Sequence, residues 1–298
     1  VPLLINLEVE RNMKPASFEY HLPRSIEEMT EMLGRYGAEG RILAGGQSLV
    51  PAMNFRLSRP EHVIDINQID ELNLLQADGN RLRIGALVRH ANFEQPVTDD
   101  VLGQLLVDVG SYVAHWPIRV RGTFVGSLAH ADPASEWCLV AVTLDAEIIV
   151  LGSDGERSIP VSEFFLGGFR TAVASHEAIV EVVVPLLGEG ASFGFTEFSR
   201  RTGDFALAMA LVVIWLDDYG RIKNAVVGIG GVESRPSRVY DAEATLQGQI
   251  PATKLFDQVA EIVAESVEPL EDIHANAAFR RDLARTMTRR SLERATAQ

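Results

Sequence analysis

The stretch Arg41-Ile42-Leu43-Ala44-Gly45-Gly46-Gln47-Ser48-Leu49-Val50 places an apolar run directly before two glycines and a hydroxyl side chain. Glycines allow backbone amides to approach a ligand closely, and amides gathered in a turn form a concave site for anions such as phosphate. No lysine follows at P-loop spacing, and the dinucleotide pattern Gly-x-Gly-x-x-Gly is absent. Two interpretations stay open here: an anion-binding turn, and a plain turn at the end of a strand.

Length and composition indicate a globular chain of about two domains. The 298 residues are 47% hydrophobic and 23% charged, and the formal charge is 27 − 41 = −14. A strongly acidic chain is a poor partner for nucleic acid or an anionic membrane surface. No apolar run is long enough to span a bilayer, and no signal peptide is recognisable, so we predict a cytoplasmic protein.

The two ends of the chain differ from the rest. We interpret residues 1–12 as a leader, with Met13-Lys14-Pro15 as the natural start. Residues 280–294 form the only basic run. We interpret this run as an exposed, solubilising helix face rather than as a nucleic-acid site.

Cysteine and histidine usage limits the chemistry of the chain. Cys138 is the only cysteine, which excludes an intrachain disulfide, a cysteine zinc site and an iron–sulfur cluster on this chain. The seven histidines include no His-x-x-x-His pair, so we predict no metal site. No nucleophile elbow occurs, and no Ser, His and Asp are ordered as a triad. We therefore predict no catalytic side chain.

Local signals in the first half predict short elements. Ser25 and Glu28 form a capping box that starts a helix over residues 25–36, and Gly37 ends it. Short strands at 42–44 and 63–66 complete a small α/β lobe. The turn signal Asp78-Gly79-Asn80 predicts a hairpin, and further patterns predict a helix near 102–109, a hairpin over 146–159 and a strand at 179–184.

Residues 185–190 interrupt the pattern and mark the predicted domain boundary. Strands are expected at 193–198, 205–216 and 222–229, although the second run also fits a helix. Helices near 237–247, 252–267 and 276–295 should cover one face of the resulting antiparallel sheet. Residues 226–233 begin like a dinucleotide fingerprint, but Glu233 stands where the third glycine belongs. We interpret them as a strand that ends in a turn.

A second loop, residues 119–133, has the sequence Arg-Val-Arg-Gly-Thr-Phe-Val-Gly-Ser-Leu-Ala-His-Ala-Asp-Pro. Asp132 is a good helix N-cap and Pro133 a good first helical residue. The loop would then bring the positive end of a helix dipole close to its own hydroxyls and amides. This pattern predicts a second anion-binding loop, with a well-capped surface loop as the alternative.

Taken together, the two loops resemble those of the FAD-binding medium subunit of molybdenum hydroxylases, the carbon monoxide dehydrogenase and xanthine dehydrogenase flavoprotein family. Residues 44–48 match the family's A-G-G-x-S, and residues 123–127 stand where the family has T-[IL]-G-G-[NS]. Val125 replaces the first glycine of that second motif. Glu233, Arg235 and the run 272–284 are similar to the family's C-terminal domain.

The resemblance implies an α+β fold in two domains. Residues 1–189 would form a two-lobed FAD-binding domain of the vanillyl-alcohol oxidase (PCMH) type, with lobes at about 13–66 and 67–189. Residues 190–298 would form a smaller α+β domain in which helices cover an antiparallel sheet. This architecture is unlike the Rossmann fold.

The resemblance also implies positions that bind FAD. Backbone amides of the first loop would hold the pyrophosphate, through Ile42, Leu43, Ala44, Gly45, Gly46, Gln47, Ser48 and Leu49. The second loop would supply Thr123, Gly126 and Ser127, with His130 near the same phosphates or in a capping role alone. Glu136 would accept hydrogen bonds from the adenosine ribose. Three apolar side chains would lie near the flavin or simply pack in the core: Val113, Val180 and Phe205.

Val125 raises a question about cofactor binding. If the replaced glycine has positive φ, a β-branched residue there would clash and weaken binding of FAD. If the backbone is ordinary at this position, valine is tolerated. The sequence leaves both outcomes open.

The implied function is electron transfer. A molybdopterin-containing large subunit would hydroxylate the substrate, and two [2Fe–2S] clusters on a small subunit would pass electrons to FAD on this chain and then to an external acceptor. The expected assembly is a dimer of heterotrimers. The version Gly-Ser-Leu-Ala-His-Ala-Asp of the second loop associates the chain with members that oxidise aromatic N-heterocycles or purines. The alternatives are a self-sufficient FAD-dependent oxidase or dehydrogenase and a flavin-free scaffold subunit.

Overall fold

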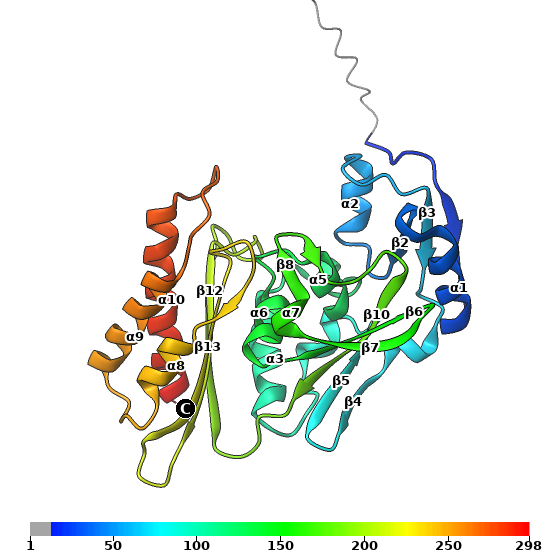
Figure 1. Ribbon diagram of the computed structural model, residues 1–298. Helices are drawn as coiled ribbons and strands as arrows, with labels where there is room; N and C mark the ends of the chain where they lie inside the picture. The colour runs from blue at the N-terminus through cyan, green and yellow to red at the C-terminus, as the bar shows by residue number, and fades with distance from the viewer. Residues whose placement is uncertain (1–12, 298) are drawn as a thin grey trace, which may run out of the picture.

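The computed structural model of the chain describes residues 13–297, so the interpretation of residues 1–12 as a leader lies outside the described residues. Three parts follow one another across the molecule (Figure 1): a small N-terminal lobe, a central lobe built on a twisted sheet, and a C-terminal domain whose helices lie on the outer side. Within the described range, no helix has the length and apolar character needed to cross a membrane.

The N-terminal lobe is a three-stranded parallel sheet in the order β1-β3-β2, formed by β1 (Glu19–His21), β3 (His62–Asp65) and β2 (Gly40–Leu43). It carries helices α1 (Ile26–Tyr36) and α2 (Leu49–Asn54). The Ser25 hydroxyl accepts a hydrogen bond from the Glu28 amide at 3.2 Å, and Gly37 ends α1 at φ +47°. The predicted helix and its two ends are therefore confirmed.

The central lobe is a five-stranded antiparallel sheet in the order β4-β5-β10-β6-β7. Its strands are β4 (Leu75–Asp78), β5 (Arg81–Gly85), β6 (Glu147–Gly152), β7 (Gly155–Pro160) and β10 (Glu177–Pro185). Both predicted hairpins are confirmed as β4–β5 and β6–β7. Its other elements are α3 (Val101–Tyr112), α4 (Trp116–Arg119), α5 (Phe124–His130), α6 (Glu136–Thr143), α7 (Val161–Phe164) and the small pair β8 (Phe165–Gly167) and β9 (Arg170–Thr171).

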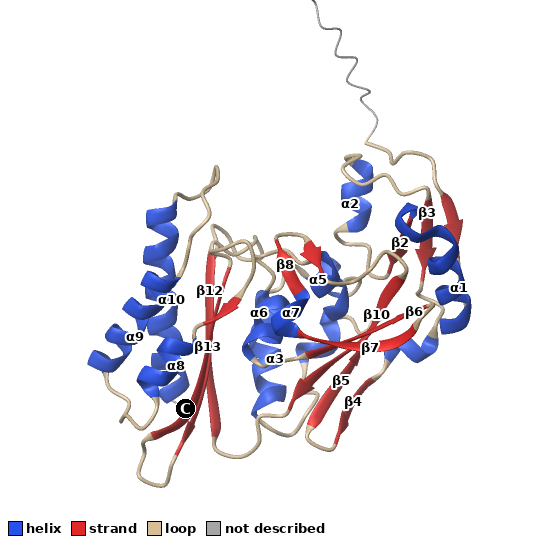
Figure 2. Ribbon diagram, viewed as in Figure 1, coloured by secondary structure: helices blue, strands red, loops and turns tan. Residues whose placement is uncertain are grey.

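The C-terminal domain is an antiparallel sheet with helices on one face (Figure 2), as the sequence predicts. Its strands are β11 (Ala191–Phe198), β12 (Ala208–Leu216), β13 (Ile222–Gly230) and β14 (Ser237–Arg238). The helices are α8 (Tyr240–Leu246), α9 (Thr253–Ser266) and α10 (Ala277–Thr296). Residues 226–233, which begin like a dinucleotide fingerprint, form the end of β13 and the turn after it, as interpreted.

Strand β12 is buried on both faces. Met209, Leu211 and Val213 join the core of the N-terminal and central lobes, whereas the alternating residues Ala210 and Val212 pack in a second core with the C-terminal helices. A strand covered on both sides has no polar face, so its sequence lacks the period of two. This explains why residues 205–216 fit a helix as well as a strand.

The basic run in α10 is not the solvated face that we expect from its sequence. Arg280 is only 4% exposed, and its guanidinium donates to the carbonyls of Leu207 and Gly231 and to Asp272. Sequence pattern alone cannot tell such an arginine from an exposed one, because two of its acceptors, Leu207 just before β12 and Gly231 just after β13, are 73 and 49 residues away. The interpretation was wrong for the buried part of this helix.

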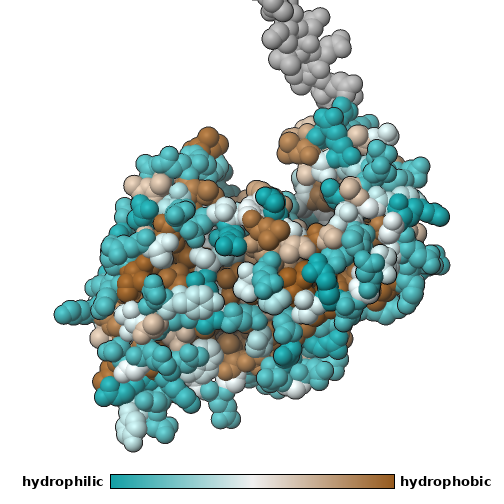
Figure 3. Space-filling view, in the orientation of Figure 1, coloured by the Kyte–Doolittle hydropathy of each residue, from teal (hydrophilic) through white to brown (hydrophobic). Residues whose placement is uncertain are grey.

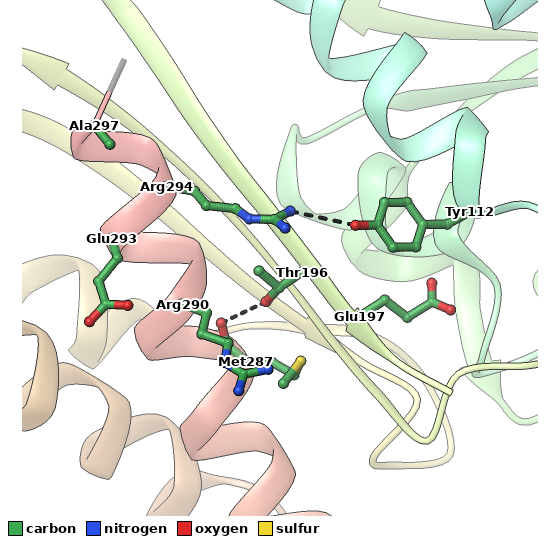
Figure 4. Close-up of a pocket in the computed structure, with 8 residues that line it drawn as sticks. All are labelled: Tyr112, Thr196, Glu197, Met287, Arg290, Glu293, Arg294 and Ala297. Carbon is green, nitrogen blue, oxygen red and sulfur yellow. Dashed lines mark hydrogen bonds between the residues drawn. The ribbon is translucent and has the colours of Figure 1, made fainter. Parts of the chain in front are cut away.

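Arg294, near the end of the same helix, joins the two domains. It donates to the Phe195 carbonyl on β11 at 2.6 Å and lies 3.5 Å from the Tyr112 hydroxyl on α3. Arg294 and Tyr112, drawn in Figure 4, line a cavity of about 320 Å³ between α3, β11 and α10. Thr196 points to the opposite side of the strand from Glu197 and donates to the Met287 carbonyl.

Replacing Gly194 on β11 by alanine should destabilise the chain by about 3 kcal/mol, because an added Cβ would lie 1.9 Å from the Ser291 carbonyl oxygen of α10. Gly34→Ala is the matched control. Its nearest neighbour would be 3.9 Å away, and alanine favours a helix by up to about 1 kcal/mol. Urea denaturation of the full chain measures both. Equal midpoints for the two variants would contradict the close packing of α10 on β11.

Candidate functional site

The two glycine-containing turns meet through their backbones. A Cβ built on Gly45 would lie 2.5 Å from the Arg121 carbonyl oxygen and 2.6 Å from the Gly122 Cα. Such distances are shorter than any side chain allows, so only glycine permits this approach. Gly46 follows with φ +71°, a left-handed conformation that also favours glycine. The first turn, residues 44–48, thus rests directly on the second, residues 119–127.

Two polar side chains that the sequence did not single out fasten these turns together. Asn67 donates to the Ala44 carbonyl at 2.8 Å, and Arg89 donates to Asn67 and to the Arg121 carbonyl, each at 2.5 Å. Arg89 therefore bridges both turns. Burial and the neighbouring Arg121 lower the pKa of Arg89, which remains a cation at neutral pH.

The second loop, residues 119–133, differs from its prediction in one respect. Asp132 does not cap a helix: its carboxylate accepts from the Ala134 amide in a local turn, and α6 begins at Glu136. The loop itself contains helix α5, whose N-cap is Thr123, and the Thr123 hydroxyl accepts from the Gly126 amide at 2.9 Å. A Cβ at Gly126 would lie 2.6 Å from that hydroxyl, so glycine protects the cap.

Val125, which replaces a glycine of the family motif, causes no backbone strain in the second turn. It lies inside helix α5, it is 3% exposed, and it is not among the described residues with positive φ. The backbone at this position is one that any L-residue adopts, so valine is tolerated. The close backbone approach falls at Gly45 and Gly122 instead.

Several hydrogen-bond donors of both turns are unused by the protein. Across residues 13–297, no acceptor pairs with the amides of Gly45, Gly46, Gln47 or Ser48. The hydroxyls of Ser48 and Ser127 likewise have no protein partner in that range. Unpaired amides that converge in a turn provide the donors that an anion such as a diphosphate requires. The space-filling view shows the surface hollowed between the N-terminal lobe and the C-terminal domain, with apolar patches at its edges (Figure 3).

His90 supports the second turn from beneath. Its amide donates to the Gly122 carbonyl, and a Cβ at Gly122 would lie 2.5 Å from the His90 ring nitrogen Nε2. The other ring nitrogen, Nδ1, is 2.9 Å from Trp137 Nε1, which donates to it. Burial, with the nearby charges of Arg119 and Arg89, lowers the pKa of His90 to about 4. A neutral imidazole is therefore part of the folded structure.

Comparison with known proteins decides the family. The sequence profile described as the FAD binding domain in molybdopterin dehydrogenase matches residues 16–187, and the profile described as the CO dehydrogenase flavoprotein C-terminal domain matches residues 193–295. The chain belongs to the molybdopterin dehydrogenase FAD-binding family. It is therefore an oxidoreductase subunit of the medium, FAD-binding type.

Members of this FAD-binding family resemble the chain over nearly their full length. The 6-hydroxypseudooxynicotine dehydrogenase complex subunit alpha of Paenarthrobacter nicotinovorans is 37% identical over 95% of this chain and 96% of its own. Carbon monoxide dehydrogenase from Hydrogenophaga pseudoflava matches in structure with a TM-score of 0.91 and 32% identity, over 95% and 98% of the two chains. Quinoline 2-oxidoreductase from Pseudomonas putida 86 matches with a TM-score of 0.89 and 33% identity, over 95% and 98%.

Glu136, which the sequence analysis expects to contact the adenosine ribose, lies at the buried start of α6. Burial raises the pKa of Glu136 to about 7, and the charge of Asp132 adds to this effect. Glu197 of β11 lies near enough to interact with it. Burial raises the pKa of Glu197 to about 9, and its Oε2 is buried without a hydrogen-bond partner in the described part of the chain. Glu197 belongs to the C-terminal domain, and no sequence pattern predicts that it lies near Glu136.

The remaining predicted residues lie in different settings. His130 packs at 5.1 Å from the Phe169 ring, and burial lowers its pKa. Val113 is 7% exposed at the end of α3, and its carbonyl accepts from Arg119 of the second loop. Val180 lies at an irregularity in β10, where its carbonyl accepts from the Ala86 amide.

Phe205 does not pack in the core, because 69% of it is exposed. It lies in the loop before β12. Gly203 of that loop has φ +85° and lies against the ring of His115, so a Cβ there would come within 2.3 Å of the ring. The loop that carries Phe205 therefore approaches the segment after α3 that carries Val113. For Phe205, the core-packing alternative is wrong.

Lowering the pH should destabilise the chain through His90. The folded-state pKa lies below the unfolded value of about 6.5, so stability from the neutral ring is fully present above pH 6.5 and is lost as the pH falls towards 4. We expect a loss of about 2 kcal/mol between pH 7 and pH 5. His90→Gln keeps an acceptor for Trp137 and should abolish this part of the slope. The exposed His274→Gln serves as control, and an unaltered slope in His90→Gln would exclude this role.

Proposed function

We propose that this chain is the FAD-carrying electron-transfer subunit of a multisubunit molybdenum hydroxylase. Electrons would come from [2Fe–2S] clusters on a small partner subunit and leave to an external acceptor. The observation that carries the proposal is the backbone contact of Gly45 with Arg121 and Gly122, which sets the first turn, with its unpaired amides, directly against the second turn. FAD, when bound there, would supply the redox chemistry.

We propose the following roles for residues of this chain. Amides of residues 42–49 and the Ser48 hydroxyl would hold the pyrophosphate from one side, with Thr123, Gly126 and Ser127 on the other. Because Thr123 Oγ1 and the Gly126 amide already pair with each other, their contribution is to shape the turn. Arg89 would add positive charge beside both turns, and His130 would border the same region.

Roles toward the rest of the cofactor follow from burial and exposure. Glu136 would accept from the ribose hydroxyls, since its buried carboxyl accepts from its own backbone amide and has further oxygen lone pairs that need donors. Phe205 is an exposed aromatic side chain that can cover a flat ring system, with Val113 and Val180 as the apolar surroundings. These side chains bind and orient the cofactor and exclude water. They hold no proton for substrate chemistry.

The partners follow from what this chain lacks. A [2Fe–2S] cluster requires about four thiolate ligands. Cys138 is the only cysteine, it is fully buried, and burial raises the pKa of its thiol to about 12. We therefore propose that the clusters and molybdopterin lie on a small and a large partner chain, in a dimer of heterotrimers in the cytoplasm. For the substrate we propose an aromatic N-heterocycle or a purine, which the match to a quinoline oxidoreductase supports.

The decisive experiment compares the purified complex with the chain alone loaded with FAD. We expect flavin absorbance near ~450 nm in both, and bleaching by the organic substrate only in the complex. Bleaching in the isolated chain would instead establish a self-sufficient dehydrogenase. A chain and complex that both lack flavin would establish a scaffold subunit.

Replacing Gly45 by alanine should abolish FAD binding, because the added Cβ would push the second turn away at Arg121 and Gly122. Gly79→Ala is the control. This glycine also lies in a turn, at φ +59°, but an added Cβ would meet nothing within 4 Å. The control should lose about 1 kcal/mol of stability and keep its flavin. Flavin per folded chain measures the effect, and full occupancy in Gly45→Ala would refute the proposed cradle.

A further inference from the structure

Two histidines and a glutamate gather on the N-terminal lobe, at the opposite end of β2 from the Gly45–Gly46 turn. Parallel pairing of β1 with β3 sets Glu19 opposite His62, and His21 follows two residues later on the same face of β1. His21 Nε2 lies 3.0 Å from His62 Nδ1. Glu19 Oε2 lies 3.5 Å from that His62 nitrogen and 3.9 Å from the His21 nitrogen. Three potential ligand atoms thus lie within 3.9 Å of one another.

We propose that His21, His62 and Glu19 form a binding site for a divalent transition-metal ion of the Zn²⁺ type. Imidazole nitrogen and carboxylate oxygen are ligands of Zn²⁺ at about 2.0–2.2 Å, and tetrahedral geometry separates such ligand atoms by about 3.3 Å. The three separations here, 3.0, 3.5 and 3.9 Å, lie around that value. An ion between them requires side-chain shifts of about 0.5 Å.

The two rings are held in place before any ion arrives. Tyr36, the last residue of α1, stacks on His62 at 3.8 Å between ring centroids and on His21 at 4.8 Å. The side chains of His21 and His62 are only 17% and 15% exposed. Rings fixed by stacking lose little conformational entropy on binding a metal. Glu19 is 72% exposed, so solvent reaches the site and a water can take the fourth position.

Charge around the site favours a cation. Glu39 and Glu61 place carboxylate oxygens within 4.8 Å of each other and of a ring nitrogen of His62. Carboxylates beside a ligating histidine are the usual partners that orient it. The two nitrogen ligands favour Zn²⁺, Ni²⁺ or Cu²⁺ over Mg²⁺ and Ca²⁺, which prefer oxygen. Sequence spacing does not reveal this set, because His21 and His62 are 41 residues apart.

Such an ion would cross-link β1, which carries Glu19 and His21, to β3, which carries His62. Strand β1 has only three residues and lies at the edge of its sheet, so few backbone hydrogen bonds hold it. A metal that binds only the folded arrangement stabilises it in proportion to the logarithm of the ion concentration. The role is structural, and it is independent of flavin binding.

The test is titration of the chelator-treated full chain with Zn²⁺ by calorimetry, followed by the visible spectrum after Co²⁺ is added. We expect one ion per chain, with micromolar or tighter affinity and the absorption bands of tetrahedral Co²⁺. His21→Gln and His62→Gln should each weaken binding by about 100-fold and remove the bands. His274→Gln removes an exposed histidine elsewhere and should bind as the wild type does.

Glu19→Gln keeps the fold intact because Glu19 is exposed, and it should weaken Zn²⁺ binding by about 10-fold. Metal-free urea midpoints and flavin content should be the same in Glu19→Gln and in the wild type. The proposal is overturned if the wild type shows no saturable binding of Zn²⁺. It is equally overturned if Glu19→Gln and the histidine variants that fold all bind as tightly as the wild type. In either case the two rings form only a hydrogen-bonded pair.

Discussion

The approach of the Gly45 backbone to the backbone of Arg121 and Gly122 is the constraint on which the rest of the site depends. Gly45 has no room for a Cβ against Arg121 and Gly122, and Gly122 has none against the ring of His90. Arg89 and Asn67 then fix the spacing of the two turns through hydrogen bonds. Gly45 is needed for a contact between two turns of the same chain. Beside this contact, the amides of Gly46, Gln47 and Ser48 have no acceptor among residues 13–297.

Elements with strong local signals were predictable from the sequence, and those that depend on distant partners were not. Ser25 and Gly37 mark the ends of α1 by chemistry that lies within one helical turn. Strand β12 gave no such signal, because its two faces are buried against different parts of the molecule. Asp132 looked like a cap because it precedes a proline, yet Thr123 and Ser135 take the cap positions of α5 and α6.

The site shows the same division. The glycines and hydroxyls of both turns were recognisable because a turn is a local structure with few suitable residues. Arg89 was not, because its acceptors are 22 and 32 residues away in the sequence. Glu197 belongs to another domain than Glu136, and only the fold makes them neighbours. Burial and the charge of Glu136 both raise the pKa of Glu197, so an ionised Glu136 disfavours a second negative charge on Glu197.

The burial of β12 on both faces limits how the two domains can be exchanged between related proteins during evolution. One face of the C-terminal sheet completes the interior of the preceding lobes, with Phe195, Met209 and Leu211 among the shared residues. A separated C-terminal half would expose that apolar face to water, and the remaining lobes would lose part of their interior. Recombination between relatives at this junction would yield working chimaeras only where the surfaces of α3 and α6 were inherited together with the sheet.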